Sequence, residues 1–227
     1  MKLFQKLLPF YIFVILAALL LTHWGSSTVT TMAESSPLQD RYCIIIDAGH
    51  GGVDGGATSC TGVLESQLNL EIALRLNDLL HLLGHDTKMI RTEDVSVYTE
   101  GQTIAAKKIS DLKQRVKLVN DTENAILISI HQNYFGDERY SGAQVFHSNN
   151  EESKNLSVLL QKGFIATGSK RNVKQTDGVY LMEHVNCPAV LVECGFLSNH
   201  AEEAKLRNYD YQKIIAMVIA SGISIFL

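Results

Sequence analysis

The sequence has no excess of positive charge. It carries 20 Lys and Arg residues against 24 Asp and Glu, a formal net charge of -4, and the basic residues are scattered along the chain. Proteins that bind nucleic acid neutralise phosphates with clustered Lys and Arg. We therefore expect no nucleic-acid partner.

The sequence also shows no internal repeat and little charge of either sign. Charged residues make up 19% of the chain and hydrophobic residues 46%, a balance typical of a globular protein rather than a disordered one. Behind the N-terminal segment, roughly 190 residues remain, which is enough for one domain with a sizeable core.

A long apolar run occurs near the N-terminus. It covers Leu7–Leu21, is interrupted only by Pro9, and follows the positive charges of Lys2 and Lys6. It is shorter than the about 20 apolar residues that a straight membrane span needs. The pattern indicates a signal peptide over residues 1–33, or an uncleaved N-terminal anchor.

A polar, Ser- and Thr-rich stretch follows this run. We interpret residues 34–40 as a linker and residues 41–227 as one folded domain. Whether the N-terminal segment is cleaved or stays as an anchor, we expect the domain to be exported. We expect it to contact a membrane only through that segment.

Cysteine is scarce, with four residues in the chain: Cys43, Cys60, Cys187 and Cys194. In an exported protein they could pair as disulfides. Cys43 and Cys194 lie in predicted core strands, where a thiol is commonly a small buried apolar group. The sequence pattern does not show which cysteines pair, or whether any of them form a disulfide.

The apolar pattern predicts alternating strands and helices. We expect strands at about 42–47, 86–91, 125–130, 142–147, 178–182 and 189–194, and helices at about 66–83, 109–121, 153–166 and 211–226. Strands that are apolar throughout are expected where helices cover both faces of a sheet. The fold class is therefore α/β, with a mostly parallel or mixed central sheet and a site at the strand carboxyl ends.

Three of these strands end in a group suited to metal binding or acid–base chemistry. His50 follows the first strand on a glycine-rich turn, His131 follows strand 125–130, and Glu193 closes the apolar run 189–192. Glu65 stands at the predicted start of a helix. Because carboxyl ends of parallel strands share one edge of a sheet, we expect these side chains to meet.

Two histidines, one ligating carboxylate and one spare carboxylate are what a hydrolytic zinc site requires. We assign the spare role to Glu193, which would take a proton from water and pass it to the leaving amine. Burial raises the pKa of such a carboxylate, which suits that role. Asp47 and Asp54 are candidates to accept hydrogen bonds from the histidines.

Arg115 and Asn133 have two interpretations each. Arg115, on a predicted helix, either fixes loop ends through backbone carbonyls or binds substrate. Asn133, close to His131, either holds a substrate carbonyl or organises its own turn.

Several blocks of the sequence, in order, resemble the zinc-dependent N-acetylmuramoyl-L-alanine amidases of bacterial cell walls. The resemblance runs from about Tyr42 to the C-terminus and rests on Ile46–Ala57, Glu65, Ile90–Asp94, Leu112–Arg115, Ser129–Asn133, Ser141–Phe146 and Pro188–Asn199.

The resemblance implies that His50, Glu65 and His131 hold one zinc ion per chain and that Glu193 is the catalytic carboxylate. It further implies hydrolysis of the amide between N-acetylmuramic acid and the L-alanine of the peptidoglycan stem peptide.

The single-domain layout and the block Ser141–Gln144 are similar to the sporulation amidases of the CwlD type. That similarity implies peptide removal from spore-cortex glycan, so that muramic-δ-lactam can form. Since no separate wall-binding repeat is visible, we also expect a regulatory protein partner or the anchor to recruit the enzyme.

Three alternatives remain open. The first is a zinc carboxypeptidase-like hydrolase that cuts within the stem peptide, since the ligand set alone does not exclude it. The second is a wall-binding module without catalysis. The third, thiol hydrolysis by Cys194, fits poorly because no base is evident beside it.

Overall fold

The computed structural model of the protein describes residues 42–227. The expected signal peptide or anchor at 1–33 and the linker at 34–40 lie outside the described residues, so both stay predictions. Among the helices of residues 42–227, none has the length and apolar character needed to span a bilayer.

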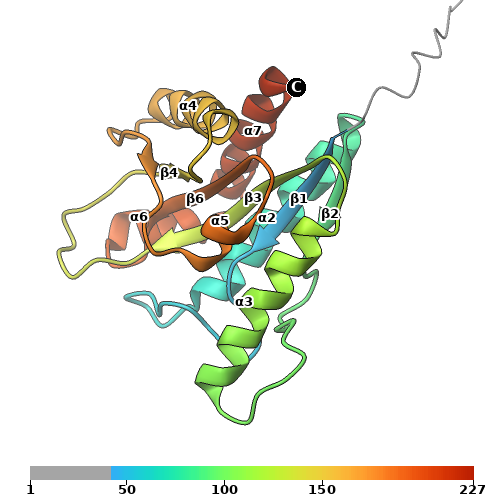
Figure 1. The fold of residues 1–227 in the computed structure, drawn as a ribbon. Coiled ribbons are helices and arrows are strands. Elements are labelled where there is room, and N and C mark those ends of the chain that lie inside the picture. Colours follow the sequence, from blue (N-terminus) through green and yellow to red (C-terminus); the bar gives the residue numbers. More distant parts are fainter. Residues whose placement is uncertain (1–41) are drawn as a thin grey trace, which may run out of the picture. The chain divides into compact units, whose positions relative to one another are not determined.

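A six-stranded sheet, ordered β2-β1-β3-β6-β4-β5, forms the centre of the domain (Figure 1). The first four strands in this order are parallel, whereas β4 runs antiparallel to β6 and parallel to β5. The sheet is therefore mixed, as expected. The bounds are β1 Cys43–Ala48, β2 Asp86–Met89, β3 Ala125–Asn133, β4 Gln144–His147, β5 Lys174–Gln175 and β6 Ala189–Phe196.

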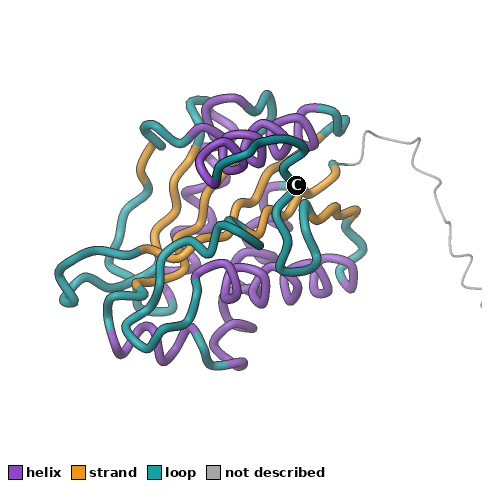
Figure 2. The backbone as a smooth tube through the Cα atoms, turned by 90° about the horizontal axis from the view of Figure 1, so that it is seen from below, coloured by secondary structure: helices purple, strands orange, loops and turns teal. Residues whose placement is uncertain are grey.

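Helices cover both faces of this sheet, and Figure 2 shows the strand layer between them. One buried cluster joins α2, α4 and α7 to the sheet, and a second joins α3 and α5 to the opposite face. The bounds are α2 Glu65–Leu82, α3 Ile104–Asn120, α4 Glu151–Ala166, α5 Tyr180–His184, α6 His200–Leu206 and α7 Tyr209–Phe226.

The alternation of side chains along β3 separates core from site. Ile126, Ile128 and Ile130 are fully buried under α2 and α7, whereas His131 is half-buried. Successive side chains of a strand point to opposite faces, so the isoleucines anchor the strand while His131 lies on the α3 and α5 side.

The expected strand at 178–182 is wrong, because residues 180–184 form the short helix α5. Leu181 and Met182 are buried against the second core cluster. An apolar run this short does not distinguish a strand from a buried helical turn. Helical geometry is supported here by the bond from Gly178 N–H to the Glu183 carboxylate, 2.8 Å.

Two other differences concern helices: one begins earlier than expected, and one was not expected. Helix α3 begins at Ile104 rather than 109, because Thr103 caps it by accepting from Ala106 N–H at 3.1 Å. The segment between the expected strand 86–91 and the expected helix 109–121 therefore contains the start of α3. Helix α6, which the apolar pattern did not indicate, is capped by Asn199 and carries buried Glu202 and Glu203.

Candidate metal centre

Neighbouring strands place His131 and Glu193 side by side. In the parallel register of β3 and β6 these two residues are direct partners. The adjoining strand β1 ends at Ala48, and the chain stays against β3 through a hydrogen bond from Gly49 N–H to the Ile130 carbonyl, 3.0 Å. Both His131 and Glu193 lie inside their strands, a few residues before the carboxyl end, rather than just beyond it.

His50 occupies a tight turn after β1. Its φ of 61° lies in the left-handed region, which is uncommon for a residue other than glycine. Gly51 and Asp54 close the turn with reciprocal backbone hydrogen bonds. Asp54 Oδ2 lies 2.9 Å from Nδ1 of His50, so a proton on Nδ1 leaves Nε2 free as a ligand. Asp54 is therefore placed to orient the His50 imidazole.

Glu65, the first residue of α2, lies at the centre of the cluster. Its Oε1 is 2.9 Å from Nδ1 of His131, and its Oε2 is 3.3 Å from Nε2 of His50. Backbone N–H groups of Ala57 and Gln132 also donate to the two oxygens, at 2.9 and 3.2 Å. The carboxylate is thus fixed in orientation, with both histidines facing it.

The donor set fits a divalent transition metal. One ligand atom from each of His50, Glu65 and His131 lies within 4.8 Å of the others. Two imidazoles and a carboxylate are a common zinc ligand set. The spacing and donor types show that the cluster could hold a metal ion.

The electrostatics of the cluster favour a positive charge. Burial disfavours the charged imidazole of His50, but hydrogen bonds and charge from Glu65 and Asp54 outweigh it and raise its pKa to about 9. Burial likewise opposes ionisation of Glu65, yet the two histidines lower the pKa of that carboxyl. Histidine nitrogens must lose their protons to bind metal, so a cation would replace protons here.

Glu193 is a carboxylate without compensating donors. Its Oε2 atom is buried and has no hydrogen-bond partner among the described residues. Burial raises its pKa to about 7, opposed by the charge of His131 and assisted by the negative charge of Glu65. A carboxyl with such a pKa can both accept and donate a proton near neutral pH.

His50, His131 and Glu193 line a pocket of ≈ 320 Å³ on the α3 and α5 side of the sheet. Lys108 and Leu112 contribute from α3, and Val179 and Leu181 from the segment at α5. The helix that the sequence pattern missed therefore supplies one wall of the pocket.

Arg115 holds the His50 turn in place. Its guanidinium donates to the carbonyls of Ala48 at 3.1 Å and His50 at 2.7 Å, and to the carboxylate of Asp111 at 2.6 Å. The side chain is 2% exposed. These contacts are the loop-fixing arrangement, one of the two interpretations offered for Arg115.

Asp47 does not accept from a ligand histidine, contrary to expectation. Its carboxylate is buried, pairs with Arg115, and accepts from the Ser129 hydroxyl at 2.7 Å. Burial raises its pKa, but the charges of Arg115 and His131, together with the hydrogen bonds from Ser129 and Arg115, outweigh this and lower it below the ordinary value. Asp47 is linked to His50 through Arg115, whose guanidinium pairs with the Asp47 carboxylate and donates to the His50 carbonyl.

Sequence reasoning missed Asn69 and Arg91. Asn69 is fully buried and donates to the Gly49 carbonyl at 3.1 Å and to Glu65 Oε1 at 3.3 Å. Arg91 donates to the carbonyls of Ala48, Gly49 and Ser66 at 2.8, 3.1 and 2.8 Å. The helical spacing of Asn69, one turn after Glu65, could have identified it.

The structure gives Asn133 and the cysteines no catalytic contact. Asn133 ends β3, and its carbonyl accepts from Leu197 N–H at 2.8 Å; its side chain makes no hydrogen bond within residues 42–227. All four cysteines are free. Burial raises the pKa of the Cys194 thiol, which argues against it as a nucleophile.

Comparison with known proteins places the whole described domain in one family. Residues 44–224 match the family model described as N-acetylmuramoyl-L-alanine amidase. Over 224 residues the chain is 36% identical to the germination-specific N-acetylmuramoyl-L-alanine amidase of Bacillus subtilis, covering 96% of this chain and 93% of that protein.

Solved structures agree with the sequence comparison. The CwlD amidase of Clostridioides difficile, in complex with the GerS lipoprotein, has a TM-score of 0.79 and 36% identity over 82% of this chain and 98% of its own. The catalytic domain of CwlV, an N-acetylmuramoyl-L-alanine amidase from Bacillus (Paenibacillus) polymyxa, has a TM-score of 0.70 and 30% identity over 82% of this chain and 97% of its own.

Proposed function

The chain belongs to the N-acetylmuramoyl-L-alanine amidase family and is an amidase that acts on peptidoglycan, and from that premise we propose how its residues perform the hydrolysis. The observation that carries the proposal is the convergence of His50, Glu65 and His131 beside the uncompensated carboxylate of Glu193. This set suits one zinc ion per chain and one proton carrier.

In this proposal His50, Glu65 and His131 hold the ion. When bound, zinc would polarise the scissile carbonyl and increase the acidity of a water molecule. Asp54 keeps the His50 imidazole oriented through Nδ1, and the two backbone N–H groups on Glu65 keep that carboxylate between the histidines.

Glu193 moves the proton. Its carboxylate accepts a proton from the attacking water and then delivers it to the nitrogen of L-alanine as the amide bond breaks. The amine must be protonated to leave, so one group that accepts and then donates is sufficient. The pKa of about 7 lets Glu193 do both.

Metal analysis with turnover tests these roles. Glu65→Ala and His131→Ala should lose both bound zinc and cleavage, whereas Glu193→Gln should keep the zinc and lose turnover. Wild-type activity in either ligand variant would contradict the ligand assignment, and an active Glu193→Gln variant would remove Glu193 from catalysis.

Product masses separate the amidase from the carboxypeptidase-like alternative. Digestion of purified peptidoglycan should release intact stem peptides that begin with L-alanine and leave peptide-free glycan. Shortened stem peptides still attached to muramic acid would support the alternative. A wall-binding module without catalysis would release neither.

We further propose that the enzyme is exported, works in spore-cortex maturation, and depends on a regulatory protein partner. The similarity to a germination-specific amidase supports the first two points, and the relative solved with a lipoprotein supports the third. Spores that lack this protein should contain no muramic-δ-lactam. An unchanged lactam content would contradict the cortex role.

A further inference from the structure

The loop between β3 and β4, residues 134–143, lies beside the catalytic carboxylate. It leaves β3 after Asn133, two residues past His131, and returns to the sheet at Gln144. Gln144 is the antiparallel partner of Glu193. Since β6 lies between β3 and β4 in the sheet, the loop must pass over the carboxyl end of β6.

This loop exposes three aromatic rings. Tyr134, Phe135 and Tyr140 are 54%, 52% and 41% exposed. Single exposed aromatic residues are ordinary, but several together on one loop mark a surface that meets a ligand. Tyr134 comes three residues after His131, which limits the distance between their Cα atoms to about 11 Å.

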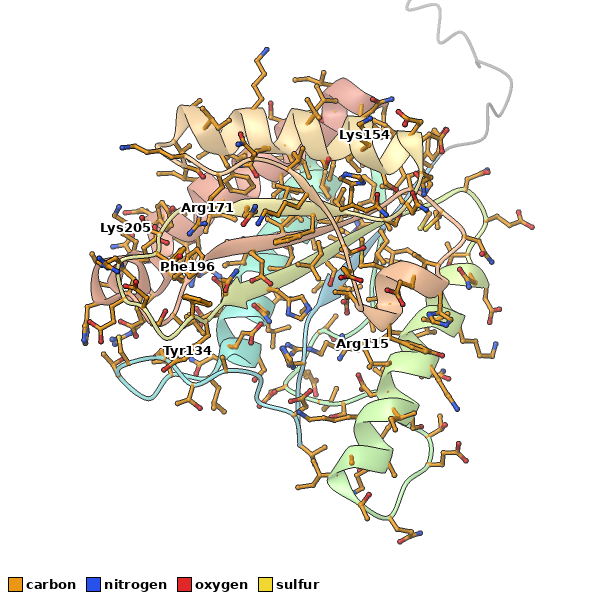
Figure 3. All side chains as sticks on the ribbon, turned by 60° about the vertical axis from the view of Figure 1, so that its left-hand side comes forward. Arg115, Tyr134, Lys154, Arg171, Phe196 and Lys205 are labelled. Carbon is orange, nitrogen blue, oxygen red and sulfur yellow. The ribbon has the colours of Figure 1, made fainter. Side chains whose placement is uncertain are left out.

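Two of the three rings, those of Phe135 and Tyr140, are held by contacts with their neighbours. Phe135 and Tyr140 meet edge to face with centroids 4.7 Å apart, and Tyr140 packs against buried Phe196 at 6.2 Å. The Arg171 guanidinium lies 5.1 Å from the Tyr140 ring and 4.8 Å from the Phe196 ring. Figure 3 shows Tyr134, Phe196 and Arg171 grouped to one side of Arg115.

Hydrogen bonds also secure the loop backbone. Ser198 Oγ accepts from Phe135 N–H at 3.2 Å, and the Asn199 side-chain amide donates to the Glu138 and Tyr140 carbonyls at 2.7 and 3.4 Å. A loop tied in this way loses little conformational entropy when a ligand binds. The exposed rings therefore form a pre-ordered surface.

We propose that Tyr134, Phe135 and Tyr140, which we call the aromatic platform, bind the glycan strand of peptidoglycan next to the muramic acid whose peptide is cleaved. The proposal rests on the proposed function, and it places the sugars that neighbour the cleaved muramic acid on these three rings. Pyranose rings present an apolar C–H face that stacks on aromatic rings, while tyrosine adds a hydrogen-bonding hydroxyl.

The substrate's chemistry favours a sugar over a protein as the occupant. The scissile amide is attached to one sugar of a polymer, so the neighbouring sugars must cross the surface beside Glu193. The platform starts within three residues of His131 and ends four residues before the partner of Glu193. It therefore lies next to the reacting residues, on a side along which those sugars would meet aromatic rings.

A comparison of substrate lengths tests the platform. Tyr134→Ala and Phe135→Ala should each raise KM for intact glycan strands about three- to tenfold, since each removes one ring contact, and leave kcat unchanged. Both variants should cleave a single-sugar N-acetylmuramoyl peptide as the wild type does. Tyr134→Phe, which keeps the ring, should restore most of the strand affinity.

Tyr209→Ala is the matched control, because Tyr209 is a tyrosine of similar exposure, 57%, at the start of α7. It should change neither substrate's kinetics. An unchanged KM for strands in both platform variants, or an equal loss on the single-sugar substrate, would overturn the platform.

Binding of peptide-free glycan strands separates this inference from the proposed function. The platform variants should bind such strands about three- to tenfold more weakly than wild type, whether or not the protein cleaves anything. Wild-type protein that binds strands through the platform but releases no stem peptide would refute the hydrolase mechanism alone. Equal strand binding by wild type and variants would refute the platform alone.

Discussion

Gly49 leaves room for only a hydrogen atom beside the imidazole of His131. A Cβ at residue 49 would lie 2.2 Å from Nε2 and 2.3 Å from Cε1 of that ring, closer than non-bonded carbon and nitrogen atoms can approach. The glycine is therefore required by a side chain 82 positions away, and not only by the turn in which it sits.

Gly49→Ala should displace His131 and weaken zinc binding, because the imidazole has to move away from Glu65 to admit the methyl group. We expect at least a tenfold loss of zinc affinity, comparable with the loss of a residue that hydrogen-bonds to a metal ligand and orients it. Competition with a metal-chelating dye measures it. Gly136→Ala, where an added Cβ meets nothing within 4 Å, is the control; equal zinc affinity in both variants would contradict the steric argument.

Asn69→Leu should also lower zinc affinity, by roughly 10- to 100-fold. Leucine has nearly the same size but makes neither the bond to Glu65 nor the bond to the Gly49 carbonyl. Gln67→Leu, exposed on the same helix, should bind zinc as the wild type does. If Asn69→Leu keeps full affinity, the backbone donors alone position Glu65.

Arg115→Lys should destabilise the protein although it keeps the charge. A lysine has no planar fork and does not reach the Ala48 and His50 carbonyls and both carboxylates at once. We expect a loss of about 2 kcal/mol in the free energy of unfolding, together with lower turnover. Arg139→Lys, whose ion pair with Asp137 is exposed, should stay within about 0.5 kcal/mol in urea unfolding.

Asp47→Asn should lower stability in a pH-dependent way. The pKa of Asp47 is below its ordinary value in the native state, so the unfolded chain takes up the proton at higher pH. The contribution is complete above about pH 4 and is lost as pH falls through the native pKa. At pH 7 the variant should be about 3 kcal/mol less stable than wild type.

Urea unfolding at pH 7 and pH 3 checks this expectation. The difference between wild type and Asp47→Asn should be smaller at pH 3 than at pH 7. Asp121→Asn, on an exposed ion pair with Lys117, should show little difference at either pH. If the difference in the free energy of unfolding between wild type and Asp47→Asn grows on acidification, the prediction is contradicted.

The sequence predicted the parts of the fold in which one pattern dominates. Strands β1, β3 and β6 are each built on an apolar run and bury most of their side chains, and each carries or leads to a histidine or carboxylate of the site. Apolar runs of this kind indicate strands of a largely parallel sheet, whose carboxyl ends share one edge, which is why the sequence suggested that His50, His131 and Glu193 would meet.

Contacts between distant residues were not predictable in the same way. Arg91 and Arg115 reach carbonyls of the His50 turn from 42 to 67 positions away, and no local pattern specifies a carbonyl as a partner. Asp47 was expected to hold a histidine because carboxylates often do; its actual partner, Arg115, lies on a helix whose docking the sequence does not reveal.

The left-handed backbone at His50 has a consequence for protein design. Two guanidinium groups from separate segments flank that strained residue: Arg91 donates to the carbonyl of Gly49, which precedes it, and Arg115 donates to the carbonyl of His50 itself. Transplanting the turn and its ligands into another scaffold would leave the strain unsupported, and the imidazole would relax away from its partners. A working transplant would have to carry both arginines and the segments that present them.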